Sequence, residues 1–231
     1  MRTNLSIHPI ALLYFAVALT EVICELLQYM PLVYVLKPMM PLLLIALYFE
    51  TSPRRNLMFY AVMFFSAVTN LLFIPFSDEI LFYGLLAFLV HRSMALGYII
   101  TLLNIRDYIP VIMATIPFLL VYFYLFWITD GIPEESFLVL ILQNILISLM
   151  CGIALSHYLM NDDKRHSWLL ICAILFGLLH VTVFVERFYL SGFAPLIFRP
   201  LAMGLNTFAF YTLYEFVMAC EKSNRDREAI H

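Results

Sequence analysis

The chain has 231 residues, of which 64% are hydrophobic and 13% are charged, and its mean hydropathy is +0.93. Water-soluble domains are closer to half apolar and a quarter charged, so this composition excludes an ordinary soluble protein. The formal net charge is only −3 and the cationic residues form no basic patch in the sequence, which excludes nucleic acid as a partner.

Long apolar runs fill almost the whole chain. Each is close to the roughly 20 residues that a helix needs to cross a ~30 Å hydrocarbon core, whereas strands with open edges would leave backbone groups unpaired in lipid. The sequence therefore predicts an all-α polytopic membrane bundle, with one transmembrane domain over residues 1–220 and a short polar cytoplasmic tail over 221–231. Eight transmembrane helices are expected, at residues 9–28, 30–49, 57–75, 80–105, 109–128, 137–160, 168–186 and 195–220.

Two starts are open for the second helix. Gln28 and Pro31 interrupt the pattern near residue 30, and Lys37, Pro38 and Pro41 interrupt it again further on. The helix therefore begins either near residue 30, with a kink, or only at Lys37, which would make it short.

The distribution of cations predicts the orientation. The loops expected on one side, at 76–79 and 129–136, contain no Lys or Arg. Because cytoplasmic loops carry the excess of Lys and Arg, both termini are expected in the cytoplasm. Nine of the thirteen cations would lie on that side: Arg2, Arg54, Arg55, Arg106, Lys164, Arg165, Lys222, Arg225 and Arg227.

Ionisable residues inside the membrane are costly and are functional candidates by default. Glu21 and Glu25 are four residues apart and share one face of the first helix, and Glu25 could equally form a plain ion pair with Lys37. Arg92, near the middle of the fourth helix, needs an anionic partner or water, and Glu21 or Glu25 is the natural candidate.

Other polar residues are expected in the non-cytoplasmic half of the bilayer, where a water-accessible cavity would gather them. His180 and Arg187 are seven residues apart and share a face, so both could line such a cavity. Simpler readings stay open: Arg187 and Arg199 could bind lipid phosphates, His180 could hydrogen-bond a neighbouring helix, and Asn70 could join two helices. The full set of substrate-binding candidates is Lys37, Asn70, His91, Arg92, Arg187 and Arg199.

No metal or cofactor is predicted. Each of the four cysteines lies inside an apolar run without metal-ligand spacing, and no phosphate-binding loop or hydrolase motif occurs. Glu21 and Glu25 alone do not supply the oxygen cluster that Ca²⁺ needs.

Several short motifs occur along the chain: Lys-Pro before a Leu-rich run at residues 37–44, Ala-Phe with a following His at residues 87–91, and Tyr211 with Glu215 four residues later. Together they resemble the YhhN-like family, the lysoplasmalogenases. The family's Lys-Pro followed by a Leu-rich run is similar to residues 37–44, its Ala-Phe-x-x-x-His to residues 87–92 with the His one place early at His91, and its terminal Tyr-x-x-x-Gln to residues 211–215. Its Gly-Asp falls on residues 69–70 and its late Leu-Phe-x-x-Ser-Asp on residues 175–180. Both Asp positions are therefore changed here, to Asn70 and His180.

The resemblance implies about eight helices, the plasma (inner) membrane of a bacterium and hydrolysis of the vinyl-ether bond of lysoplasmalogen-type lysophospholipids. Such chemistry needs one group that gives a proton and another that activates water. Asn70 cannot act as an acid, whereas His180, with a reference pKa near 6.5, can exchange protons. The expected catalytic residues are therefore His180, Glu25 and Glu21, and Glu186 is a further carboxylate that could replace a lost Asp. The alternatives are a non-catalytic protein that binds or senses membrane lipid and, less favoured, a small transporter; the oligomeric state is not predicted.

Overall fold

A computed structural model describes residues 8–75, 78–103, 105, 107–130, 132–161, 163–190 and 195–228. These residues form helices and no strand: α1 (Pro9–Leu26), α2 (Met30–Thr51), α3 (Leu57–Leu72), α4 (Asp78–Leu102), α5 (Ile109–Trp127), α6 (Glu134–Met160), α7 (Lys164–Phe184), the π-helix η1 (Val185–Tyr189) and α8 (Phe198–Glu228). The predicted all-α bundle with eight long helices is confirmed.

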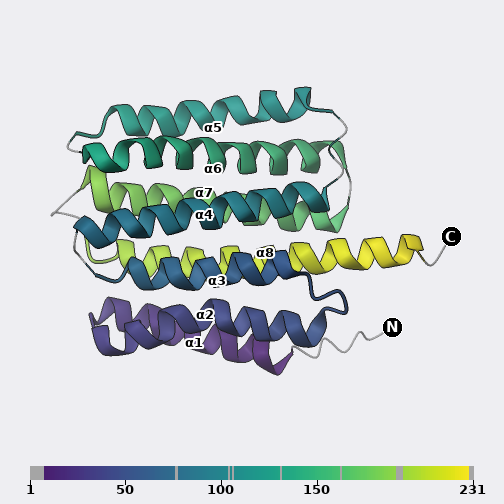
Figure 1. The fold of residues 1–231 in the computed structure, drawn as a ribbon, viewed down its shortest axis with the longest axis horizontal. Coiled ribbons are helices and arrows are strands. Elements are labelled where there is room, and N and C mark those ends of the chain that lie inside the picture. The colour runs from purple at the N-terminus through teal and green to yellow at the C-terminus, as the bar shows by residue number, and fades with distance from the viewer. Residues whose placement is uncertain are drawn as a thin grey trace.

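The helices run back and forth as an elongated bundle (Figure 1). Contacts between neighbours follow a ring in the order α1, α2, α3, α4, α6, α7 and α8, which returns to α1, while α5 contacts α6 outside the ring. Gly152 of α6 permits the close approach of α5, because a Cβ at that position would lie 2.0 Å from Thr115 Oγ1. Small residues have this role at helix contacts in membranes.

Large apolar side chains cover the outside of the bundle. On α5, for example, Ile112, Met113 and Leu120 are each at least 60% exposed, as expected of a surface that contacts lipid. Within the described part of the chain, six helices are long and apolar enough to cross a membrane: α1, α2, α4, α5, α6 and α7 with η1. The apolar α3 is shorter, and α8 is interrupted by polar residues that face the interior, such as Asn206 and Thr207.

The second helix begins at Met30, so a start at Lys37 is wrong. Pro31 lies in the first turn of α2, where its missing N–H costs nothing, and Gln28 makes the preceding turn with a φ of 56°. Pro38 and Pro41 lie inside the helix. Pro41 has no N–H to donate to the carbonyl of Lys37, four residues earlier.

Helices α6, α7 and α8 extend at one end beyond the predicted apolar runs into polar sequence, whereas α1, α3, α4 and α5 end before the predicted runs do. Helix α7, for example, begins at Lys164, where Asp163 caps its first turn by accepting a hydrogen bond from the Arg165 N–H. Helix α8 continues to Glu228, and Glu221 in this extension is buried and accepts hydrogen bonds from Tyr48 and Ser52. Hydropathy marks the apolar part of a helix but not its polar ends, which explains these extensions.

Helix α1 begins and α8 ends at the same end of the bundle (Figure 1). We call this the cationic end, because the described cations Arg54, Arg55, Lys164, Arg165, Lys222 and Arg225 lie at helix ends or connections there. Three other cations used to predict the orientation lie outside the described part of the structure: Arg2, Arg106 and the side chain of Arg227. The acidic side chains at positions 78 and 79 also lie outside it.

Candidate functional site

A polar pocket lies near the end of the bundle opposite to the cationic end. Its volume is about 80 Å³, and residues from α2, α3, α4, α7, η1 and α8 line it. The apolar lining residues include Phe73, Phe88 and Met203. The polar lining residues are Lys37, Thr69, Asn70, Glu186, Arg187, Arg199 and Asn206. We call it the ion-pair pocket.

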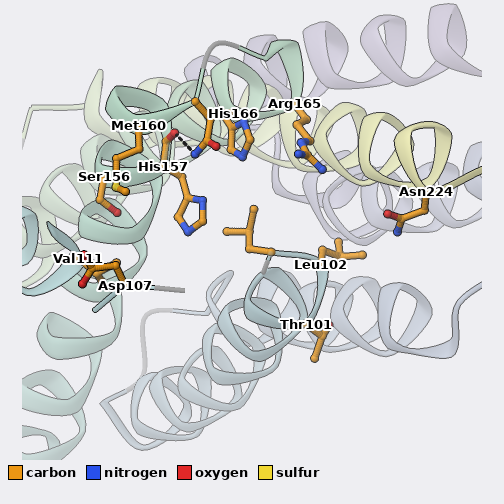
Figure 2. A pocket seen from close by; sticks show the side chains of 12 residues that line it. Thr101, Leu102, Asp107, Val111, Ser156, His157, Met160, Arg165, His166 and Asn224 are labelled. Carbon is orange, nitrogen blue, oxygen red and sulfur yellow. Dashed lines mark hydrogen bonds between the residues drawn. The ribbon is translucent and has the colours of Figure 1, made fainter. Parts of the chain in front are cut away.

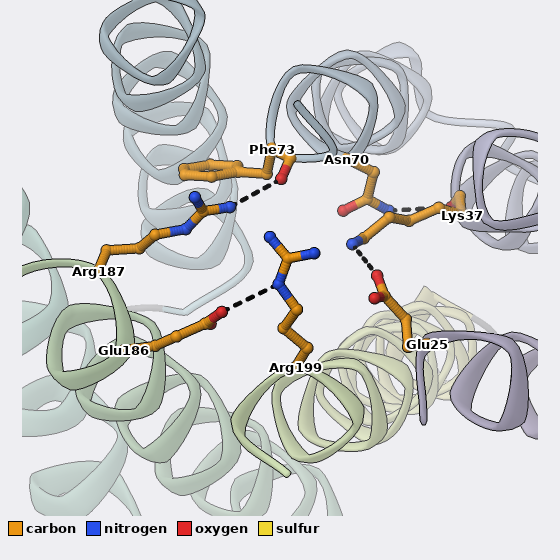
Figure 3. A network of polar contacts seen from close by, with 7 residues as sticks. All are labelled: Glu25, Lys37, Asn70, Phe73, Glu186, Arg187 and Arg199. Carbon is orange, nitrogen blue, oxygen red and sulfur yellow. Dashed lines mark hydrogen bonds and ion pairs between the residues drawn. The ribbon is translucent and has the colours of Figure 1, made fainter. Parts of the chain in front are cut away.

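Two buried or half-buried ion pairs lie at this pocket (Figure 3). Lys37 Nζ is 2.6 Å from Glu25 Oε1, and the two side chains are 9% and 1% exposed. Arg199 Nε is 3.1 Å from Glu186 Oε1. In a medium of low polarity, such pairing offsets the cost of removing each charge from water, so the pocket holds charged groups that the membrane interior would otherwise exclude.

Two further polar contacts at the pocket satisfy backbone carbonyls. Asn70 Nδ2 donates to the Lys37 carbonyl oxygen at 3.1 Å, which is the carbonyl that Pro41 leaves without a helical donor. Arg187 Nη2 donates to the Phe73 carbonyl oxygen at 3.0 Å, at the C-terminal end of α3, where a cation is favourable. The pocket therefore also holds α1, α2, α3, η1 and α8 together, as Figure 3 shows.

A second polar cluster joins α4, α6 and α7. Arg92 Nη1 is 3.1 Å from His180 Nδ1, and His180 Nε2 is 2.7 Å from Asn144 Oδ1. The three residues are at most 5% exposed, and Arg92 also lies over the Phe88 ring, 4.3 Å from its centroid. We call these three residues the Arg92 cluster. Nδ1 of His180 accepts from the guanidinium, and Nε2–H donates to the amide oxygen, so both nitrogens are occupied.

The prediction that Glu21 or Glu25 pairs with Arg92 was wrong. Neither Glu21 nor Glu25 lies within ion-pair distance of Arg92, and no Arg92–carboxylate pair occurs among the described residues. Stacking on an aromatic ring and donating to a neutral imidazole replace the carboxylate.

The structure separates the predicted site residues into two groups. Lys37, Asn70, Arg187 and Arg199 line the ion-pair pocket, and Glu25 is joined to it through Lys37. His180, Arg92, His91 and Glu21 are not among its lining residues. Instead, His91 Nδ1 lies 3.0 Å from the Val62 carbonyl oxygen, while the buried Glu21 carboxyl has no hydrogen-bond partner among the described residues.

The π-helix explains why His180 and Arg187 do not share a cavity wall. A π-turn contains more residues than an α-turn, so η1 rotates Arg187 out of register with His180. Leu179 and Val183 of α7, and not His180, line the pocket together with Arg187. A seven-residue spacing in the sequence cannot reveal such an insertion.

Glu186 was expected only as a possible replacement for a lost Asp, and Asn206 was not expected at the site. Glu186 precedes Arg187 at the end of an apolar run, and Asn206 is an isolated amide inside α8. An isolated polar residue in an apolar helix is the only signal that could have identified Asn206.

Comparison with known proteins gives one match. The model of the YhhN family matches residues 32–219. Neither a curated protein nor a solved structure matches the chain. The matched region includes every pocket residue named above and leaves out all of α1, which contributes Glu25.

Proposed function

Because this chain belongs to the YhhN family, we propose that it is a lysoplasmalogenase-like hydrolase, which cleaves the vinyl-ether bond of a lysophospholipid bound at the ion-pair pocket. The observation that carries the proposal is the mixed lining of the pocket. Three cations, Lys37, Arg187 and Arg199, line the same space as apolar residues such as Phe88 and Met203. That lining suits an amphiphile with an anionic head and an apolar chain, of which one part enters the pocket of about 80 Å³.

The reaction requires a balanced set of proton transfers. A carboxylic acid protonates the outer carbon of the vinyl ether, and the carboxylate that remains accepts a proton from the water that attacks the oxocarbenium carbon. The hemiacetal hydroxyl then loses a proton while the glycerol oxygen gains one, and the bond to that oxygen breaks to release an aldehyde and an alcohol. In our proposal Glu186, which lines the pocket, carries out the first two transfers, and Glu25, joined to the pocket through Lys37, assists the last two. The partners Lys37 and Arg199 stabilise each carboxyl when it is charged, and Arg187 holds the phosphate.

This proposal moves the acid–base role away from His180. Both nitrogens of that ring are hydrogen-bonded in the Arg92 cluster, and His180 does not line the ion-pair pocket. Asn70, at the other family Asp position, is a donor to a carbonyl oxygen. Glu186 lines the pocket directly and is therefore the first carboxyl to test.

The test is hydrolysis of a lysoplasmalogen, and of a matched ester lysolipid, by detergent-purified protein. We expect turnover of the vinyl ether to fall by about 10²-fold or more in Glu186→Gln, the range of general acid–base catalysis, while the helical circular dichroism signal is retained. Glu134→Gln, an exposed carboxylate on α6, is the matched control and should keep full turnover. Unchanged turnover in Glu186→Gln would remove Glu186 from the mechanism.

A second candidate is a lipid-binding or lipid-sensing protein without catalysis. Two observations favour it: both carboxylates at the pocket are ion-paired, and neither family Asp is present. It predicts lysophospholipid that co-purifies with the wild-type protein and is retained by Glu186→Gln, with no turnover of either lipid.

We also propose that the ion-pair pocket opens on the non-cytoplasmic side of a bacterial inner membrane. The described cations at the opposite end of the bundle support this orientation. The orientation can be tested by introducing a single cysteine at Trp127 or at Lys222 and treating intact cells with a membrane-impermeant thiol reagent. Only the cysteine at position 127 should react.

A further inference from the structure

A larger cavity lies at the cationic end, remote from the ion-pair pocket. Its volume is about 610 Å³, which is within the ~300–1,000 Å³ typical of small-molecule sites. It is lined by residues at the end of α4, the start of α5, the end of α6, the start of α7 and the late part of α8. It shares no lining residue with the ion-pair pocket. Figure 2 shows side chains from these elements around the cavity.

The wall of this cavity carries hydrogen-bond donors that the protein does not use. The rings of His157 and His166 stack with centroids 5.6 Å apart. His166 is only 3% exposed, yet its Nδ1 has no hydrogen-bond partner among the described residues. A buried polar nitrogen left without a partner costs free energy, and a ligand in the cavity would remove that cost.

Arg165 provides a positive charge at the wall of this cavity. Its Nε lies 2.9 Å from Asp163 Oδ2, but its terminal nitrogens make no hydrogen bond to the part of the protein that the structure describes. In Figure 2 the Arg165 side chain lies between His166 and Asn224 at the wall of the cavity. The one carboxylate among the lining residues, Asp107, already accepts a hydrogen bond from the Ile109 N–H at the start of α5.

We propose that this cavity binds a phosphate ester that carries hydroxyl groups. The Arg165 guanidinium can bind two phosphate oxygens at once, the His157 and His166 rings can donate to the phosphate, and Asn224 can bind a hydroxyl group. The chemistry is the same for a soluble ligand from the cytoplasm and for the head group of an anionic lipid in the adjacent leaflet. The proposal does not depend on hydrolysis at the ion-pair pocket.

The experiment uses the full chain in phosphatidylcholine nanodiscs. Calorimetric titration with glycerol 3-phosphate, with glycerol as the blank, tests a soluble source. Native mass spectrometry after exchange into nanodiscs with phosphatidic acid tests a lipid source. We expect binding in at least one arm, and a loss of about tenfold or more in Arg165→Gln, the magnitude of one charge-assisted hydrogen bond.

Lys164→Gln is the matched control, because it removes the same charge from the neighbouring exposed position outside the cavity wall. Asn224→Asp places a negative charge at the wall of the cavity and should also weaken binding. This variant replaces Arg165→Gln as the test if Arg165→Gln does not fold. Binding only to glycerol 3-phosphate identifies a soluble ligand, and retention only of phosphatidic acid identifies a lipid. No binding in either arm, binding unaffected by both cavity variants, or an equal loss in Lys164→Gln would overturn the proposal.

Discussion

The ion-pair pocket and the Arg92 cluster are both polar and both enclosed by apolar helices, and the Phe88 ring lines the pocket and also lies under Arg92. They differ in the groups that their cations contact. Lys37 and Arg199 each have a carboxylate partner, whereas Arg92 has an imidazole and an aromatic ring. The pocket also contains space beside its charges, while both nitrogens of His180 are occupied by protein groups. The comparison teaches that a charge inside the membrane indicates a binding site only where unfilled volume accompanies it.

The largest effect on stability is expected when an ion pair of the pocket is broken. Lys37→Met leaves Glu25 buried without its cation and should lower the free energy of unfolding by about 3–5 kcal/mol. Thermal unfolding in detergent measures the change. The double variant Lys37→Met/Glu25→Met, which removes both charges, should recover most of the loss; a double variant as unstable as the single one would show that the pair is not what stabilises this contact.

His180→Ala should have the next largest effect. It leaves Arg92 Nη1 and Asn144 Oδ1 without partners, which costs about 2–3 kcal/mol for a hydrogen bond to a charged group. In contrast to Glu186→Gln, the variant should keep its turnover per folded molecule. Hydrolysis that disappears in folded His180→Ala would return the acid–base role to this histidine and contradict the distinction between the two clusters.

Asn70→Leu tests the structural part of the pocket. The Lys37 carbonyl has no helical donor because residue 41 is proline, so loss of the Asn70 amide leaves it unpaired, at a cost of about 1–2 kcal/mol. Chemical unfolding in mixed micelles measures this difference. A variant as stable as the wild type would show that water or another group replaces the amide.

Gln143→Leu is the matched comparison with the smallest expected effect. Gln143 Nε2 also donates to a carbonyl oxygen of a neighbouring helix, that of Leu85, at 2.9 Å. That carbonyl keeps its own helical donor, because residue 89 is leucine and has an N–H. The loss should therefore be near the ~0.6 kcal/mol average for hydrogen bonds between membrane helices. A loss equal to that of Asn70→Leu would contradict the role assigned to Pro41.

Much of the fold follows from the sequence alone. Eight helices and nearly all of their positions could be read from the lengths of the apolar runs, because the bilayer fixes both the length and the composition of a spanning helix. The Glu25–Lys37 pair was also an open alternative from the sequence, since a short connection brings the end of α1 beside the start of α2 and buried charges seek partners.

Which polar residues share a site was decided by the tertiary structure. Two features that hydropathy cannot register were responsible. The π-turn at η1 rotates Arg187 away from His180 and toward the pocket, and Pro41 creates an unpaired carbonyl that Asn70 must reach from another helix. A sequence records which polar groups must be satisfied inside the membrane, but the partner of each depends on helix rotation and on contacts between residues far apart in the chain.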